Sequence, residues 1–376
     1  MDDPGDSHRC RQQSECTDGR LVRPHRGRLL RYSLLPGLYV WHNRALLPGD
    51  LLTPTRERRG LPEGPTGLPG KIDRIARNLV VDATVAEVAT ALEQKDVACI
   101  VLKGATISRW LYEDTASRRY SDCDLLVSPD HLAAAGKVLA WLGFRAVEQA
   151  EVPRDRPVHG RLWMREGSAP VDLHARIPGV GVDPSAAWSI LSSHTERFEV
   201  AGAQVDVLRP SGRALLVAMH AAQHGPRLDK PIRDLERATS RLSDGVWRDS
   251  TLLAEALEAS DMLSAGLRLV EGGERLADQL GLPPAGSTEA RLLASRVPTH
   301  AITVEWLAQM PGVRAKVGFF IRKTWPSVAY MRAISPVAKE GGIGVARAYV
   351  IRTLHLVRAS VPTIQAWRRA RRGDTL

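Results

Sequence analysis

Two aspartates spaced by one residue, Asp122 and Asp124, begin an apolar run that ends at Val127. Because successive side chains of a β-strand point to opposite faces, residues two apart share a face, and both carboxylates would point the same way. Paired carboxylates are ligands of hard divalent cations such as Mg²⁺. This stretch therefore predicts a metal site at the head of a strand that is anchored by its buried apolar end.

A third carboxylate, Asp172, lies on a later expected strand, two residues before His174 and on the same face. We expect Asp172 to face the same cleft as Asp122 and Asp124, and to complete a three-carboxylate cage able to hold two ions. Hard oxygen ligands favour Mg²⁺ or Mn²⁺ over zinc. Such a cage suits nucleotidyl transfer, in which charge on the phosphates must be neutralised while a hydroxyl attacks in line.

An anion-binding turn is predicted upstream of the aspartate pair. The apolar run from Val97 to Leu102 reads as a strand, and it is followed by Lys103-Gly104 and by a helix through Leu111. A strand, a glycine turn and a helix together aim unpaired backbone N–H groups at an anion. Lys103 adds a point charge to this turn.

Other polar residues leave two readings open. Arg118 and Arg119 would either pair with a triphosphate or balance the aspartate pair. His174 would either orient substrate or Asp172, or form a hydrogen bond within the sheet. His220 and His224 lie one helical turn apart and would either share a metal or serve as structural histidines facing the catalytic domain.

The order of patterns along the 376 residues divides the chain into four parts. Residues 1–70 are rich in Arg, Pro and Gly, and we expect a disordered or loosely ordered basic extension. Residues 71–210 contain the expected strands and form the core. Residues 211–312 are expected to form a helical domain, in which Asp234 either faces the cleft or stabilises the first turn of its helix. Residues 313–376 are expected to form a basic helical tail.

Periodicity assigns the elements of these parts. One or two amphipathic helices are expected from Lys71 to the first strand. Hairpins are expected at 160–177 and at 197–208, the second turning at Ala201-Gly202. Helices follow from Ser211, including one over 263–280 and a last one over 343–367 that is broken at Pro362.

The formal net charge of +10 is concentrated at one end. From Arg314 to Leu376 there are 13 Lys and Arg against 2 Asp and Glu, so the rest of the chain is nearly neutral. This tail could dock phosphates, RNA or an anionic membrane surface, or it could be a solvated face of the last helices. No apolar run approaches the roughly 18 to 20 residues of a membrane helix.

The four cysteines, Cys10, Cys16, Cys99 and Cys123, include no C-x-x-C pair, and the last two fall in expected buried strands. We interpret them as free thiols of a cytoplasmic protein, since the basic N-terminal stretch also lacks the apolar segment of a signal peptide.

Several of these motifs together resemble a known family. Val101-Leu102-Lys103-Gly104-Ala105, Leu111-Tyr112, the run RRYSDCDLLV from Arg118 to Val127 and Val171-Asp172-Leu173-His174 occur in that order. They resemble the uncharacterised nucleotidyltransferase family of the DNA polymerase β-like superfamily, in which an "LKG" strand end, a "D-x-D-L-L-V" run and an "(I/V)-(D/E)-L-H" strand recur. The likeness covers residues 97–177 well and the helical segment around His220 more loosely.

The resemblance implies an α+β fold, with a small mixed sheet followed by a mostly helical C-terminal region. It implies metal binding by Asp122, Asp124 and Asp172, and nucleotide phosphate binding near Lys103 and Gly104. It also implies an NTP co-substrate, with ATP expected, and a setting beside bacterial ribosomal-peptide clusters such as those of lasso peptides. One departure is Ala105, because the wider superfamily has a serine at this position of the turn.

Our leading hypothesis is transfer of a nucleoside monophosphate from an NTP to an unidentified small-molecule or peptide acceptor, with Asp172 as general base if one is needed. One alternative is a D-x-D glycosyltransferase, which would not need Asp172, and an Asp-x-Asp phosphatase fits less well because Leu125 and Leu126 follow the pair. Another is a non-catalytic scaffold that recruits a peptide precursor or processing enzyme through the basic tail. Nucleic acid is a less favoured partner of that tail.

Overall fold

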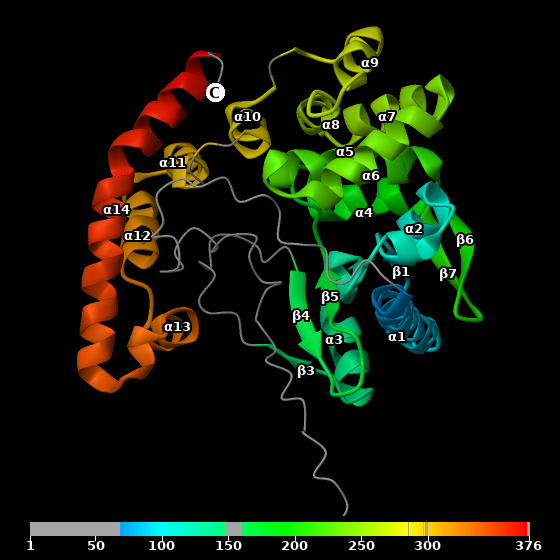
Figure 1. Ribbon diagram of the computed structural model, residues 1–376, viewed down its shortest axis with the longest axis horizontal. Helices are drawn as coiled ribbons and strands as arrows, with labels where there is room; N and C mark the ends of the chain where they lie inside the picture. Colours follow the sequence, from blue (N-terminus) through cyan, green and yellow to red (C-terminus); the bar gives the residue numbers. More distant parts are fainter. Residues whose placement is uncertain (1–67, 148–159, 285, 296, 298–299, 374–376) are drawn as a thin grey trace, which may run out of the picture. The chain divides into compact units, whose positions relative to one another are not determined.

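A mixed β-sheet organises the part of the chain that positions the predicted site (Figure 1). The computed structural model describes residues 68–147, 160–284, 286–295, 297 and 300–373. Residues 1–67 of the expected extension over 1–70, with Cys10 and Cys16, lie outside the described residues, and residues 68–70 begin the first helix. Cys99 and Cys123 are free and buried, as predicted.

Seven strands of the described residues form this sheet in the order β3-β4-β5-β2-β1-β7-β6. Strand β1 is antiparallel to β2 and parallel to β7, and β2 is parallel to β5. The remaining neighbours are antiparallel. The strands are β1 (Cys99–Val101), β2 (Cys123–Val127), β3 (Arg145–Ala146), β4 (Gly160–Met164), β5 (Val171–His174), β6 (Thr195–Val200) and β7 (Ala203–Leu208).

One face of the sheet packs on α1 (Leu68–Glu93) and α3 (Leu132–Trp141). Alternate residues of β2, among them Leu125 and Val127, are buried in this core with Val171 and Leu173 of β5. Residues of even number on these strands therefore face the other side, because side chains alternate along a strand. Asp124, Asp172 and His174 belong to this second set.

The second face is covered by helices from later in the chain. Ile100, Leu102 and Leu126 lie in one core with residues of α2 (Ala105–Leu111), α4 (Pro184–Ser192) and α5 (Pro210–His224). The same core continues into α6 (Asp229–Arg241), α7 (Asp244–Ala256), α8 (Ser260–Leu267) and α9 (Gly273–Gln279). The helical region thus packs on the face that carries the predicted site residues.

A separate core joins α10 (Thr288–Ala294), α11 (His300–Gln309), α12 (Val313–Thr324) and α14 (Gly341–Arg372), and a small fourth core packs α13 (Val328–Ile334) on the first part of α14. The buried members of the separate core include Leu292, Trp306, Phe319, Ala366 and Ala370. Short 3-10 turns complete the described elements at Thr115–Ser117, Pro129–His131, Gly225–Arg227 and Val337–Lys339. In the described part of the chain, every helix is too short or too polar to cross a membrane.

The α+β fold predicted from the sequence is confirmed: a mixed sheet is followed by helices. Both hairpins form as expected, and the second turns at Ala201 and Gly202, both with positive φ (49° and 82°). Three expectations were wrong. The helix over 263–280 is two helices separated at Gly272, α4 and α13 were not predicted, and α14 continues through Pro362. A proline removes only one N–H from the ladder, and the remaining bonds of this 32-residue helix hold it together.

Candidate active site

The pairing of β2 with β5 brings the acidic residues together. Their parallel register sets Asp124 opposite Asp172 and Leu126 opposite His174. Facing residues of neighbouring strands share a side of the sheet, so Asp124 and Asp172 project into the same space, as predicted. One ligand atom each of Asp124, Asp172 and His174 lies within 4.8 Å of the other two, a grouping able to hold a metal ion.

Asp124 is the centre of the contacts in this group. Its Oδ1 accepts a hydrogen bond from Lys103 Nζ at 3.3 Å and lies 3.2 Å from His174 Nε2. The same imidazole nitrogen lies 3.3 Å from Asp172 Oδ2. One carboxylate is therefore shared by a lysine from the end of β1 and a histidine from β5, while the histidine also reaches the second carboxylate.

The charges of these neighbours decide the ionisation of Asp124. Burial by itself would raise the pKa of its carboxyl, but the Lys103 ammonium and the hydrogen bond with His174 outweigh burial and hold the pKa well below its usual range. Burial would likewise lower the pKa of His174, and the charges of Asp172 and Asp124 raise it instead. The carboxyl of Asp124 is thus ionised at neutral pH although its side chain is almost fully buried.

The pKa values of the other two carboxyls, Asp172 and Asp122, are raised. Burial raises the pKa of Asp172, and the positive charge of His174 offsets part of that rise. Burial and then the charge of Asp124 raise the pKa of Asp122. The structure places Asp122 in the bend just before β2, and within the described residues it is not a member of the three-atom group. His174 takes that place.

A glycine of the adjacent strand makes room for the group. A Cβ built on Gly160 of β4 would lie 2.7 Å from Asp172 Oδ1 and 2.8 Å from His174 Nδ1. Real Cβ atoms do not approach that closely, so any larger residue must displace one of these side chains. His174 Nδ1 is buried, and we find no hydrogen bond to it in the described part of the protein.

The predicted glycine turn forms between β1 and α2. Gly104 precedes the helix with φ 75°, a conformation that favours glycine, and a Cβ built on it would lie 3.4 Å from Cδ2 of the Tyr120 ring. Arg118 Nη1 donates to the Gly104 carbonyl oxygen at 3.2 Å and so fixes the turn from behind. Ala105, which begins α2, is buried and carries no hydroxyl.

The two arginines before the aspartate pair have different surroundings. Arg118 is 3% exposed and forms a bidentate ion pair with Asp234 of α6, with Nε to Oδ1 at 2.8 Å and Nη2 to Oδ2 at 2.7 Å. Tyr112 Oη donates to the same Oδ1 at 2.7 Å. Arg119 is exposed, and its charge acts on Asp73 of α1. The guanidinium of Arg118 is therefore engaged by protein groups on both sides.

Two histidines of α5, His220 and His224, lie beside each other, and His220 is close enough to Asp124 to act on its ionisation. The rings of His220 and His224 in α5 meet edge to face with centroids 4.7 Å apart. Burial and then the charge of Lys103 lower the pKa of His220 well below its ordinary value and that of His224 to about 4, so both are neutral at pH 7. Neutral imidazoles here serve as polar neighbours of the acidic group.

Lys230, in the first turn of α6, was not anticipated from the sequence. Burial and the charge of Arg118 lower the pKa of its ammonium to about 8, and the carboxylates of Asp122 and Asp124 act against that change. Asp229-Lys230-Pro231 is an ordinary polar helix start. Only its proximity to β2 in the fold marks this lysine as part of the site.

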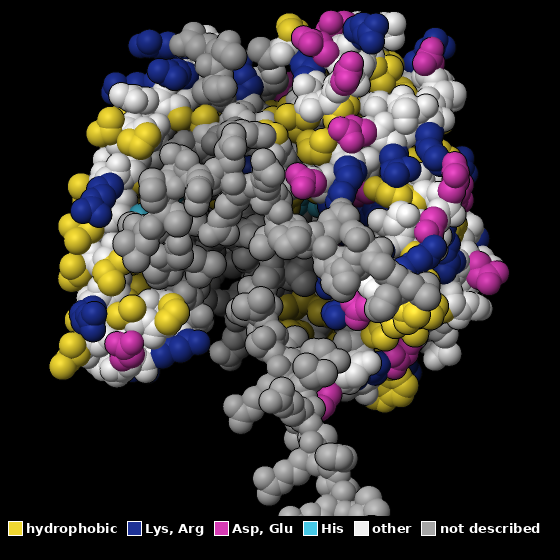
Figure 2. Space-filling view, viewed as in Figure 1, with side chains coloured by type: hydrophobic (Ala, Val, Ile, Leu, Met, Phe, Trp, Pro, Cys, Tyr) yellow, Lys and Arg dark blue, Asp and Glu magenta, His cyan; other side chains and the backbone are white. Residues whose placement is uncertain are grey.

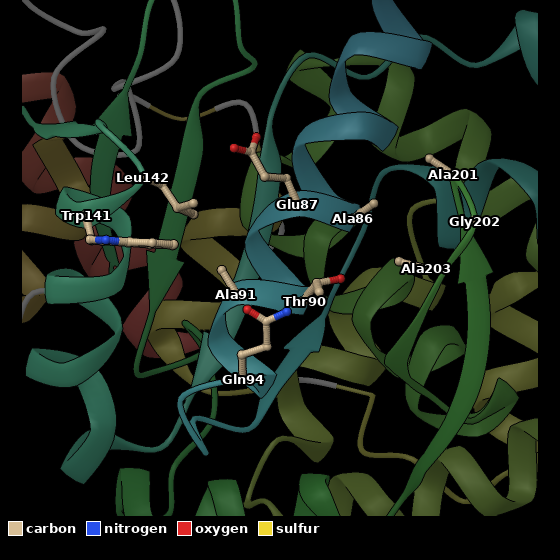
Figure 3. Close-up of a pocket in the computed structure, with 10 residues that line it drawn as sticks. All are labelled: Ala86, Glu87, Thr90, Ala91, Gln94, Trp141, Leu142, Ala201, Gly202 and Ala203. Atoms are coloured by element: carbon tan, nitrogen blue, oxygen red, sulfur yellow. The ribbon is translucent and has the colours of Figure 1, made fainter.

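A shallow hollow of about 540 Å³ lies elsewhere, between α1, α3 and the turn from β6 to β7 (Figure 3). Glu87, Thr90 and Gln94 of α1 line it, and Trp141 extends from α3 toward α1. It is on the face of the sheet that packs on α1 and α3. Asp124 and Asp172 face the other side, so this hollow is separate from the acidic group.

The sheet, its glycine turn and its paired carboxylates fit the class of nucleotidyltransferases. Residues 72–272 match the family described as uncharacterised nucleotidyltransferases. The match spans more than half of the chain, and the protein belongs to this family. No curated protein matches the chain.

Three solved structures overlap the chain in part. The solution structure of the antibiotic-resistance factor ANT(2'')-Ia is 14% identical, with a TM-score of 0.34, and the overlap covers 48% of this chain and 90% of that chain. The crystal structure of ANT(2'')-Ia in complex with adenylyl-2''-tobramycin is 14% identical, with a TM-score of 0.35, and the overlap covers 46% of this chain and 97% of that chain. An antigenic nucleotidyltransferase-like protein from Paracoccidioides brasiliensis is 17% identical, with a TM-score of 0.31, and the overlap covers 48% of this chain and 92% of that chain. Overlap at this level says nothing about the substrate of the present protein.

Proposed function

We propose that this protein transfers a nucleoside monophosphate from an NTP to an acceptor hydroxyl, with Mg²⁺ or Mn²⁺ held by Asp124 and Asp172. The observation that carries the proposal is the parallel register of β2 and β5, which sets these two carboxylates side by side. Membership of the nucleotidyltransferase family supports the reaction class.

The donor groups fit a divalent cation. Two carboxylates and an imidazole nitrogen lie within 4.8 Å of one another, and Asp124 is kept ionised by Lys103 and His174. Oxygen-rich donor sets favour Mg²⁺ or Mn²⁺. When bound, such an ion neutralises phosphate charge and lowers the pKa of the acceptor hydroxyl. We include Asp122, which adjoins Asp124 in the chain, as a further carboxylate ligand.

The residues around the metal ligands would position the nucleotide. Lys103 and the backbone of Gly104 would bind the triphosphate, and Lys230 would add a second charge from α6. Arg118 would act as a positioning residue, because it holds the Gly104 carbonyl and is already paired with Asp234. Arg119 stays a predicted triphosphate contact, although its exposed charge acts on α1.

The chemical step joins the acceptor to the nucleotide. The acceptor oxygen forms a bond to the α-phosphorus, and the bond from that phosphorus to the oxygen bridging to the β-phosphate breaks. Pyrophosphate leaves, and the hydroxyl proton passes to the Asp172 carboxylate. We propose ATP as the NTP, and a small molecule or peptide of natural-product biosynthesis as the acceptor.

One observation favours a second candidate, a catalytically weak scaffold for peptide maturation. Ala105 offers no hydroxyl at the position where the wider superfamily has serine, so one phosphate contact is lost. A D-x-D glycosyltransferase is less well supported, because it assigns no role to Asp172, and Asp172 pairs with Asp124 across the strands.

The test combines nucleotide binding with transfer. Calorimetry of Mg·ATP and labelling of candidate acceptors from α-labelled NTPs are measured on the wild type, on Asp124→Asn and on Asp130→Asn, an exposed aspartate just beyond β2 that serves as the control. We expect Asp124→Asn to lose about a hundredfold or more of transfer while keeping the far-ultraviolet circular dichroism of the wild type, and we expect Asp130→Asn to keep full transfer. Full activity of Asp124→Asn would overturn the mechanism, and failure of the wild type to bind Mg·NTP would favour the scaffold.

A further inference from the structure

Helix α14 exposes a continuous line of aliphatic side chains. Ile343, Val350, Leu354, Val357, Val361 and Ile364 are between 40% and 81% exposed. Their spacings of seven, four, three, four and three residues place them on one side of a helix. We call these six residues the apolar stripe.

The opposite side of α14 anchors the helix to the protein. Ala348, Ala366 and Ala370 are buried there, and Arg352 Nε donates to the Thr324 carbonyl oxygen of α12 at 3.1 Å. Trp367 Nε1 donates to Glu305 Oε2 of α11 at 2.7 Å. The helix thus has a packed side that holds it in place, and the apolar stripe is a second, solvent-facing side.

Exposed apolar residues are concentrated in this part of the chain. Of the 19 large hydrophobic side chains that are exposed among the described residues, 12 lie between Val313 and Ile364. They include two aromatics, Phe320 of α12 and Trp325 directly after it, at 53% and 52%. Scattered single apolar residues need no explanation, but a concentration like this marks an interaction surface.

The charges on α14 itself are all positive, and one acidic residue, Glu340 just before the helix, lies 3.8 Å from Arg347. Gly341–Arg372 contains no aspartate or glutamate, and Arg347, Arg358, Arg368 and Arg369 are exposed on it. Figure 2 shows basic and hydrophobic side chains mixed along the margin where α14 lies. A partner of this surface must therefore offer apolar groups to the stripe and negative charges to the arginines beside it.

We propose that α14 lies in the plane of an anionic phospholipid surface, with the apolar stripe toward the acyl chains and the arginines at the phosphates. Aliphatic stripes flanked by long basic side chains bind membranes in this way, because the arginine heads stay at the interface while the apolar face is buried. Trp325, directly after α12, is of the residue type enriched at such interfaces. The proposal is independent of the proposed transfer reaction.

Two other occupants fit the surface less well. A second copy of the chain would bring arginines against arginines, since α14 has no acidic residue to pair with them. A single-stranded nucleic acid stacks its bases on aromatic rings, and the stripe is aliphatic. An anionic membrane satisfies both the stripe and the charges.

The experiment is flotation of the full-length protein with vesicles of phosphatidylglycerol and phosphatidylcholine in equal parts, and with vesicles of phosphatidylcholine alone. The stripe variant carries Val350→Gln, Leu354→Gln and Val357→Gln. A matched control carries Ile72→Gln, Leu79→Gln and Leu252→Gln, which are similarly exposed on α1 and α7. A charge variant carries Arg358→Gln and Arg368→Gln.

We expect the wild type to bind the anionic vesicles and to leave the neutral ones. The affinity of the stripe variant for anionic vesicles should be at least about tenfold lower than that of the wild type, and the affinity of the matched control should be unchanged. Each arginine removed in the charge variant should lower the affinity about fivefold. Equal binding of the stripe variant and the wild type would overturn the proposal. So would absence of anionic vesicle binding, a solution dimer that the stripe variant dissociates, or retention of an RNA oligonucleotide but not of vesicles.

Discussion

The candidate site depends on how closely single atoms approach one another. Asp124 Oδ1 lies within 3.3 Å of both Lys103 Nζ and His174 Nε2, and Gly160 leaves no space beside Asp172 and His174. A buried carboxylate needs such partners, since an unpaired buried charge costs several kcal/mol. The geometry of the group is therefore set as much by Lys103 and Gly160 as by the acidic residues.

At Gly160 we expect substitution by alanine to weaken divalent-metal binding and transfer together. The added Cβ would lie 2.7 Å from Asp172 Oδ1, so this carboxylate or His174 must move. A displaced supporting group typically costs about 10- to 100-fold in metal affinity. Mn²⁺ titration calorimetry of Gly160→Ala measures the effect.

The matched substitution is Gly245→Ala in α7, where the nearest atom to the new Cβ is Ser243 Oγ at 3.8 Å. It should leave Mn²⁺ binding and transfer unchanged. If Gly160→Ala bound Mn²⁺ with the affinity of the wild type, the prediction would be wrong, because metal binding would not depend on the positions of Asp172 and His174.

At the scale of elements, the glycine turn and α6 are joined through one ion pair. Arg118 reaches Asp234 with two hydrogen bonds and the Gly104 carbonyl with a third, and all of these are buried. Tyr112 of the β1 to β2 connection donates to the same carboxylate. The helical region is thus connected to the turn that we propose binds phosphate.

Removing one partner of the Arg118–Asp234 ion pair should destabilise the protein. We expect Arg118→Met to lower the free energy of unfolding by about 3–5 kcal/mol, because it leaves the Asp234 carboxylate buried without the positive charge of its arginine. The double variant Arg118→Met with Asp234→Leu should lose less than Arg118→Met alone. Chemical denaturation of the wild type and of these two variants gives the free energies of unfolding.

The exposed pair of Arg77 with Asp73, four residues apart in α1, supplies the comparison. Arg77→Met should cost about 0.5 kcal/mol or less, as exposed helix pairs do. If the double variant were as unstable as Arg118→Met alone, the buried charge of Asp234 would not be the cause of the instability.

At the scale of the whole described structure, burial is divided among separate cores. Two of them sandwich the sheet, and a third joins α10, α11, α12 and α14, with no fully buried residue in common. The residues of the candidate site belong to the sheet. The surface proposed to meet the membrane lies on α14, which contributes Ala366 and Ala370 to the third core.

This division predicts that the two properties can be separated. Phe319, at 1% exposure, fills the third core, and Phe319→Ala should destabilise it by about 3–5 kcal/mol. Vesicle binding should fall because α14 is no longer held, while Mg·NTP binding at low temperature should be kept. Leu125→Ala, in the core under β2, should instead impair nucleotide binding. Loss of both properties in Phe319→Ala would show that the cores are not independent.

Much of the site followed from local pattern. The period of two along 123–127 and 171–174 assigned Asp124 and Asp172 to the polar side of buried strands, and the glycine at 104 marked the turn with positive φ. Family motifs gave the reaction class. The basic charge of the tail was countable directly from its residues.

Only the tertiary structure decided which strands are neighbours. The parallel register of β2 with β5 brought His174 into the donor group, placed Asp122 just outside the strand, and made Gly160 a contact of the site. Arg118 found its partner 116 residues away, and Lys230 reached the site from the start of α6. Sequence fixes what each segment prefers locally, through alternation and turn chemistry, whereas pairing partners and register depend on long-range burial that no local pattern encodes.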